Sequence, residues 1–134
     1  GILLTLALEK HAYDVIDLLL KKNLEIKESD MTYFIKNFRK GDELNYYKIL
    51  NNHLNKFNIN NILKSLSDYY YDDNIEYFVT YLIDNQIKID EEIKKELKEI
   101  SSLSLIFKKE DVINNYKKLD DKLDSRQSTK KTKI

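Results

Sequence analysis

Apolar residues recur along this chain with the spacing of amphipathic helices. The clearest stripe consists of Ala12, Val15, Ile16, Leu19 and Leu20. An equally regular stripe consists of Ile75, Phe78, Val79, Leu82 and Ile83. Steps of three and four positions place the members of each stripe on one face of a helix. Both segments are therefore predicted to be helices with one buried face.

Less regular stripes indicate six further helices, which gives about eight helices in four pairs. One of them precedes a tight break near His11. The others cover approximately residues 30–40, 44–57, 59–66, 91–100 and 112–123. Polar residues stand at several expected ends, because Asn23 can take a left-handed cap and Asp72 and Asp90 can cap the helices that follow them.

Composition supports an all-α fold in one domain. The 134 residues include no Pro and only two Gly. Both residue types interrupt helices, and β-hairpins rely on Gly at their turns. Hydrophobic residues make up 42% and charged residues 34%, a composition that can bury a core. We expect one helical-repeat domain over residues 1–123, with the last helix pair (90–123) as a C-terminal cap. Residues 124–134 are polar without a period, and we expect this tail to be frayed unless a partner holds it.

The charge balance removes several classes of partner. Lys and Arg together number 23, as do Asp and Glu, so no net positive field attracts nucleic acid or anionic lipid. The longest apolar runs, such as residues 18–20, are far shorter than the ~20 residues that cross a bilayer. Without cysteine, neither a disulfide framework nor a thiolate metal site can form. We expect no nucleic-acid partner by bulk charge and no membrane span.

The helix pairs recur at a nearly constant interval. Aligning the second helix of each pair places Val15–Ile16, Tyr46–Tyr47 and Phe78–Val79 in register. The two intervals between successive sites differ by a single position. An unrelated helical bundle has no reason to keep such an interval. Short helix pairs at a near-constant period are typical of a solenoid, in which each unit buries its apolar faces against its neighbours. The pattern favours a short solenoid of antiparallel helix pairs.

The stretch from Ile2 to Ile26 resembles an ankyrin repeat. The positions of that family's T-P-L-H-x-A segment are occupied by Leu4, Leu6, Ala7 and Leu8. Residues 15–20 match its V-V-x-L-L-L helix and residues 21–26 its x-x-G-A-D-V exit, although Leu3, Thr5 and Asn23 replace the family's Pro, His and Gly. The resemblance implies a divergent ankyrin-like stack, in which this stretch is an internal unit. It also implies an intracellular protein of the cytoplasm or nucleus.

No residues form a convincing catalytic or metal-binding pattern. His11 and His53 lie in different units, and we favour turn filler and solvated helix surface over catalysis or metal ligation. An acidic group consists of Asp68, Asp72, Asp73 and Glu76. It lacks the central Gly and alternating ligands of a calcium loop, which favours helix capping over a cation site. We expect no enzyme activity, no cofactor and no small-molecule substrate.

Tyrosine is frequent, and two explanations remain open. Ten residues are Tyr, including Tyr46–Tyr47 and the run Tyr69–Tyr70–Tyr71. Adjacent helix residues cannot all face inward, so some of these rings are expected at the surface or in a groove. Exposed Tyr is a good interface residue, whereas a bias of the genome towards Tyr at half-buried positions needs no function.

These patterns together predict a non-enzymatic protein–protein interaction or scaffold module. By resemblance to ankyrin stacks, the partner protein would lie across the first helices and the turns. The residues expected there are Glu9, Tyr33, Lys36, Arg39, Tyr69, Tyr70, Asp72 and Asp73. Replacing Tyr69 and Tyr70 together by Ala is expected to weaken partner capture without lowering the melting temperature. The alternative is a structural or accessory subunit, or an inhibitor, bound within a large macromolecular assembly.

Overall fold

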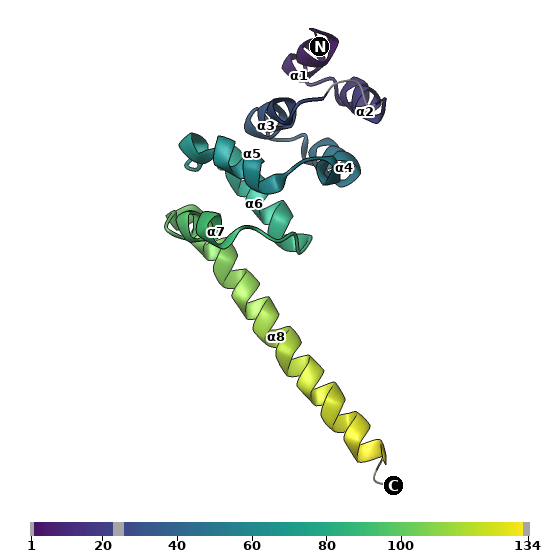
Figure 1. Cartoon of the computed structure of the whole chain (residues 1–134), viewed down its shortest axis with the longest axis vertical. Helices are drawn as coiled ribbons and strands as arrows, with labels where there is room; N and C mark the ends of the chain where they lie inside the picture. The colour runs from purple at the N-terminus through teal and green to yellow at the C-terminus, as the bar shows by residue number, and fades with distance from the viewer. Residues whose placement is uncertain (1, 23–25, 133–134) are drawn as a thin grey trace.

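The computed structural model describes residues 2–22 and 26–132, with side chains as far as Asp124 (Figure 1). The helices are α1 (Ile2–Glu9), α2 (Tyr13–Lys21), α3 (Glu28–Lys36), α4 (Glu43–His53), α5 (Ile59–Ser65), α6 (Asp73–Asp84), α7 (Glu91–Lys98) and α8 (Ser101–Thr132). Two short 3₁₀ segments are η1 (Leu54–Lys56) and η2 (Ser67–Tyr69). The described residues contain no strand, so the predicted all-α fold is confirmed. Asn23, expected to cap the second helix, lies outside the described residues.

Helices that are not consecutive in the chain lie next to one another. Helices α1, α3, α5 and α7 contact one another in that order, α2 contacts α4, and α6 contacts α8. Figure 1 shows α1 and α3 on one side and α2 and α4 on the other, with α8 extending away from the remaining helices. Buried side chains from all eight helices join in one hydrophobic core. None of the described helices is long and apolar enough to span a membrane.

Buried positions repeat along the chain. In the second helices the buried sets are Ile16/Leu19/Leu20, Tyr46/Ile49/Leu50 and Ile75/Phe78/Val79. In the first helices, counting Leu66 directly after the end of α5, the buried pairs Met31/Ile35, Ile62/Leu66 and Ile93/Leu97 recur with equal steps between consecutive pairs. Corresponding members of consecutive sets are separated by roughly 30 residues, a period in the range of helical repeats. The register of the third pair differs from the predicted one, because Phe78 corresponds to Ile49 and not to Tyr46.

Several apolar side chains of the predicted helices lie at the surface instead of in the core, among them the whole apolar stripe predicted for residues 112–123. Val15 is 39% exposed, and Leu44, where the predicted fourth helix begins, is 88% exposed. Polar residues take part in the buried faces instead, namely Asp17 in α2 and His53 in α4. Apolar spacing alone does not predict buried polar residues, so the predicted buried faces differ from the observed ones at these positions.

Other helix boundaries also differ from the predicted ones, and α8 begins at Ser101 and not near residue 112. α3 ends at Lys36 and not near residue 40, since Asn37 donates its side-chain amide to the Tyr33 carbonyl oxygen and Phe38 turns into the core. α8 continues to Thr132, beyond the predicted end of the last helix at residue 123, and the expectation of a frayed tail stays a prediction. The tail has no Pro or Gly, and its Lys, Arg and Gln residues have good helix propensity.

Candidate functional site

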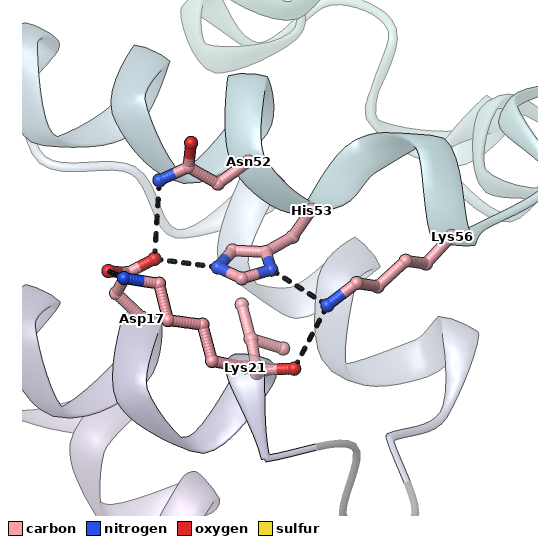
Figure 2. A network of polar contacts seen from close by, with 6 residues as sticks. Asp17, Lys21, Asn52, His53 and Lys56 are labelled. Atoms are coloured by element: carbon pink, nitrogen blue, oxygen red, sulfur yellow. Dashed lines mark hydrogen bonds and ion pairs between the residues drawn. The ribbon is translucent and has the colours of Figure 1, made fainter.

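A buried polar cluster joins α2 to α4 (Figure 2). Asp17 projects from α2 and His53 from the end of α4, and their Oδ1 and Nε2 atoms are 2.6 Å apart. Asp17 is 8% exposed and His53 is 1% exposed. Lys21 Nζ lies 3.1 Å from the other carboxylate oxygen, and the Asn52 amide donates to Oδ1 at 3.5 Å. Side chains from two successive helix pairs thereby meet in one cluster.

Lys56 completes the cluster and defines the tautomer of His53. Its Nζ atom lies 3.1 Å from His53 Nδ1 and 3.1 Å from the carbonyl oxygen of Leu20. An ammonium group can only donate, so Nδ1 accepts and the neutral ring carries its proton on Nε2, which donates to Asp17. The Leu20 carbonyl belongs to the last turn of α2, where a cation is favourable. Lys56 therefore connects the imidazole of one helix pair to the backbone of the preceding pair.

This arrangement makes His53 a structural link. Both ring nitrogens are occupied by protein groups, which leaves no free nitrogen to act as a base. The expectation that His53 lies on a solvated helix surface is wrong, because Asp17 and Lys56 satisfy the buried ring. His11 does lie in the turn between α1 and α2, with φ of 54° and its Nε2 atom 3.2 Å from the Asn37 carbonyl oxygen.

Opposing effects act on the pKa of Asp17. Burial raises it, whereas hydrogen bonds from His53, Lys21 and Asn52 lower it, and the resulting pKa lies below the ordinary value of 3.8. A carboxyl group whose pKa is lower in the folded chain than in the unfolded chain stabilises the fold above its unfolded pKa. That contribution is lost as the pH falls through the lowered value. The stabilisation that the Asp17 carboxylate contributes is therefore present at neutral pH.

Equivalent residues also meet at the next junction between helix pairs. Tyr47 takes the position in α4 that Asp17 has in α2, and Tyr81 takes the position in α6 that Asn52 has in α4. The two rings stack with their centroids 5.8 Å apart. The Tyr81 hydroxyl group donates to the side-chain oxygen of Asn51 at 2.6 Å. The same pair of positions thus carries a polar contact at the first junction and an aromatic contact at the second.

Further hydrogen bonds join one helix pair to the next at a similar separation. The Tyr13 hydroxyl group donates to Asp42 Oδ2 at 2.5 Å, across 29 residues. The Asp90 backbone N–H donates to Asn60 Oδ1 at 2.9 Å, across 30 residues. Burial and the bond to Asp42 raise the pKa of Tyr13, and the same bond lowers the pKa of Asp42. Polar side chains therefore contribute to the contacts between Tyr13 and Asp42 and between Asn60 and Asp90.

Tyr46 is buried with a hydroxyl group that has no hydrogen-bond partner among the described residues. Its ring is 0% exposed and packs on Phe34 and Phe38, with ring centroids 5.5 and 4.4 Å away. Burial raises the pKa of this hydroxyl group well above 10. A buried polar group without a partner costs roughly 1–3 kcal/mol. We therefore expect Tyr46→Phe to raise the free energy of unfolding by about 1 kcal/mol, measured by urea denaturation.

The matched control for Tyr46→Phe is Tyr70→Phe. Tyr70 is also buried, but its hydroxyl group donates to the Leu63 carbonyl oxygen at 2.8 Å. Removing it leaves a buried carbonyl group unsatisfied, so we expect a loss of about 1 kcal/mol. A loss of similar size in both variants would show that Tyr46 has a partner after all.

The run of three tyrosines divides between core and surface. Tyr70 is 5% exposed, and burial raises its pKa to about 12. Its assignment to the partner-binding surface is therefore wrong, and replacing it is expected to lower the melting temperature. Tyr71 is 83% exposed and is the residue of this run that a partner could contact most fully. Tyr69 is partly buried, with Lys36 Nζ 3.6 Å from its ring centroid.

The structure places the other expected partner-binding residues in separate local contacts. Lys36, on α3, makes a cation–π contact with the ring of Tyr69. Arg39 donates its Nε–H to Asp42 at 2.9 Å and so approaches the Tyr13 hydroxyl group. These contacts occupy the loops that follow α3 and α5, where the resemblance to ankyrin repeats would place a partner.

Exposed acidic side chains begin α6. Asp72 occupies the N-cap position without a capping hydrogen bond from its side chain, and Asp73 lies in the first turn, where the helix dipole favours a negative charge. Asp68 is exposed in η2. Among the residues that the structure describes, no group of three His, Cys, Asp or Glu side chains could hold a metal ion.

A groove of about 560 Å³ lies between α1 and the beginning of α3. Its lining residues are Ile2, Thr5, Leu6, Glu9, Lys27, Ser29 and Asp30. Ile2 is 82% exposed and Leu6 is 47% exposed, so the groove offers apolar surface. Tyr33, 40% exposed, lies one helical turn beyond Ser29 on the same face of α3. Glu9 and Tyr33, both expected to meet a partner, therefore lie at or beside this groove.

Comparison with known proteins gave no match, either to a protein-family model, to a curated protein or to a solved structure.

Proposed function

We propose that this chain is a non-enzymatic protein–protein interaction module built as a short stack of ankyrin-like helix pairs. The observation that carries this proposal is the recurrence of buried positions, and of hydrogen bonds between successive pairs, at a period of roughly 30 residues. In a stack of repeats, each unit buries its apolar face on the next and leaves a continuous surface for a partner. The ankyrin-like stretch from Ile2 to Ile26 supports the same assignment.

The surface that best fits a partner is the groove between α1 and α3 together with Tyr33. It combines apolar side chains with charged ones, as protein interfaces do. Tyr is one of the residue types that most often dominate the binding energy of protein interfaces. The partner would be a protein that places an apolar side chain between Ile2 and Leu6.

Affinity capture with matched variants tests this proposal. The full chain serves as bait beside Glu9→Lys/Tyr33→Ala, which alters the groove, and Leu44→Ala/Lys48→Ala, which alters exposed residues of α4. We expect a protein retained by the unaltered chain and by the α4 variant, and at least about tenfold less of it on the groove variant. All three chains should melt at the same temperature. Equal retention by the groove variant would remove the assignment of this surface.

A second candidate function is that of an accessory subunit or inhibitor held within a larger assembly. The observation that favours it is α8, whose residues 111–124 are all exposed although five of them are large and apolar. A chain that migrates as a free monomer when extracted from its native source would count against this function.

A further inference from the structure

Helix α8 is buried at its beginning, whereas residues 111–124, called here its free half, are exposed. Leu103 is 0% exposed and Phe107 is 2% exposed, and Lys94 of α7 lies 2.6 Å from Glu110 Oε1. The hydrogen bond to Glu110 raises the pKa of Lys94. From Asp111 to Asp124 every residue is exposed, and Figure 1 shows this half of the helix extending away from the other helices.

The free half of α8 carries one regular apolar seam. Val112, Tyr116, Leu119 and Leu123 are 64%, 73%, 56% and 47% exposed. Steps of four, three and four positions are the spacing of the a and d positions of a coiled coil, which face a partner helix. With Val112 and Leu119 at d, and Tyr116 and Leu123 at a, the seam forms four core layers. Ile113, 50% exposed, lies beside the seam and lines the hollow between α8 and the loop that follows α6.

The charges beside this seam match a second, antiparallel copy of the same helix. Lys117 and Asp120 lie on one side of the seam and Asp111 and Lys122 on the other. In an antiparallel pair, each side of one helix faces the same side of the other. Lys117 then approaches Asp120 of the second copy, and Asp111 approaches Lys122 of the second copy. Opposite charges meet on both flanks, which favours association.

Sterics also favour the antiparallel arrangement. The last anchored residue, Glu110, precedes Val112 by less than one helical turn. In a parallel pair, both helical domains would lie at the same end of the seam. Because the seam begins within one helical turn of each domain, the two domains would crowd each other. An antiparallel pair places the two domains at opposite ends.

We propose that α8 pairs with α8 of a second copy of this chain, antiparallel, with Val112 opposite Leu123 and Tyr116 opposite Leu119. Four layers are fewer than an independent coiled coil needs, so the dimer is weak, with a dissociation constant on the order of 10–100 µM. Burial of the seam removes its large side chains from water.

Sedimentation equilibrium of the full chain between about 5 and 500 µM tests the pairing. We expect the average mass to rise from monomer to dimer over this range. Leu119→Gln/Leu123→Gln should raise the dissociation constant at least about tenfold, whereas Leu44→Gln, a change of an equally large exposed side chain on α4, should leave it unchanged. A monomer throughout the range would overturn the proposal, as would undiminished dimerisation of the seam variant.

Disulfide trapping tests the direction of the pair, because the chain has no cysteine of its own. In the antiparallel pair, Val112→Cys and Leu123→Cys chains should cross-link when mixed, and neither should cross-link efficiently alone. Efficient cross-linking of Val112→Cys with itself would show a parallel pair and overturn the assignment. Circular dichroism of each variant checks that its helix content is unchanged.

Discussion

Phe78→Ala is expected to lower the free energy of unfolding by about 3–5 kcal/mol. Phe78 is 0% exposed and lies in the middle of α6, which contacts both α3 and α8. Removing its ring loses buried apolar surface and leaves a cavity that the surrounding helices fill only partly. A domain of this size has a total stability of roughly 5–15 kcal/mol, so the variant is close to unfolding at room temperature. Urea denaturation at constant m value measures the loss.

Leu44→Ala is the matched control for the core substitution. Leu44 is as apolar as a core residue, but it is 88% exposed at the start of α4. We expect its replacement to change stability by less than about 0.5 kcal/mol. Comparable losses in the two variants would mean that the buried face of α4 includes Leu44, and that the register of the repeat is wrong.

Asp17→Ala is expected to lower the free energy of unfolding by about 2–3 kcal/mol, because it leaves the buried His53 Nε2–H without its acceptor. His53→Ala should cost a similar amount. Since each residue is the other's partner, the double variant should lose less than the sum, with a coupling free energy of about 1–3 kcal/mol. Chemical denaturation at pH 7 of the four chains of this cycle provides the measurement.

Asp14→Ala is the control for the buried pair. Asp14 lies on α2, three positions before Asp17, and its side chain is exposed. Its replacement should change stability little and should show no coupling to His53→Ala. Additive losses for Asp17 and His53 would mean that the two side chains do not interact in solution.

The helices were predictable because apolar spacing and capping residues carry local information. Asp90 stands at the N-cap position of α7 where the pattern places it, although its side chain makes no capping hydrogen bond, and Gly41 makes the turn after α3 with φ of 107°. The register of the repeat was less accessible. Tyr46 and Tyr47 are both amphipathic rings, and only the packing of Tyr46 on Phe38 and of Tyr47 on Tyr81 separates core from edge.

The buried pair Asp17–His53 and the burial of Tyr70 could not be predicted from one sequence. Asp17 and His53 are 36 residues apart, and each alone reads as a solvated helix residue. The available signal was their place beside buried apolar neighbours, Ile16 and Leu54, but a polar residue there is equally compatible with a helix edge. In the core, the Tyr70 hydroxyl group donates a hydrogen bond to the Leu63 carbonyl oxygen of α5, a contact that depends on the fold of η2.

The full length of helix α8 was also missed by the apolar pattern. Beyond Leu123 no apolar residue recurs at helical spacing, yet the helix continues to Thr132. Helix propensity, rather than a buried face, supports such a segment. The seam from Val112 to Leu123 was visible in the sequence, but its exposure depends on the direction in which α8 leaves the other helices.

The proposed stacking of helix pairs is tested most directly by distances between spin labels on the first helices. Leu6, Tyr33, Lys64 and Lys95 are exposed positions on α1, α3, α5 and α7, and the last three are equally spaced in the sequence. Cysteines placed there in this cysteine-free chain can be labelled in pairs for pulsed electron paramagnetic resonance.

Neighbouring helices pack about 10 Å apart, so the stack should give about 20 Å from position 6 to 64 and about 30 Å from position 6 to 95. The interval from 33 to 95 should again be about 20 Å. A distance from 6 to 95 no longer than that from 6 to 64 would show a closed helical bundle and contradict the stack.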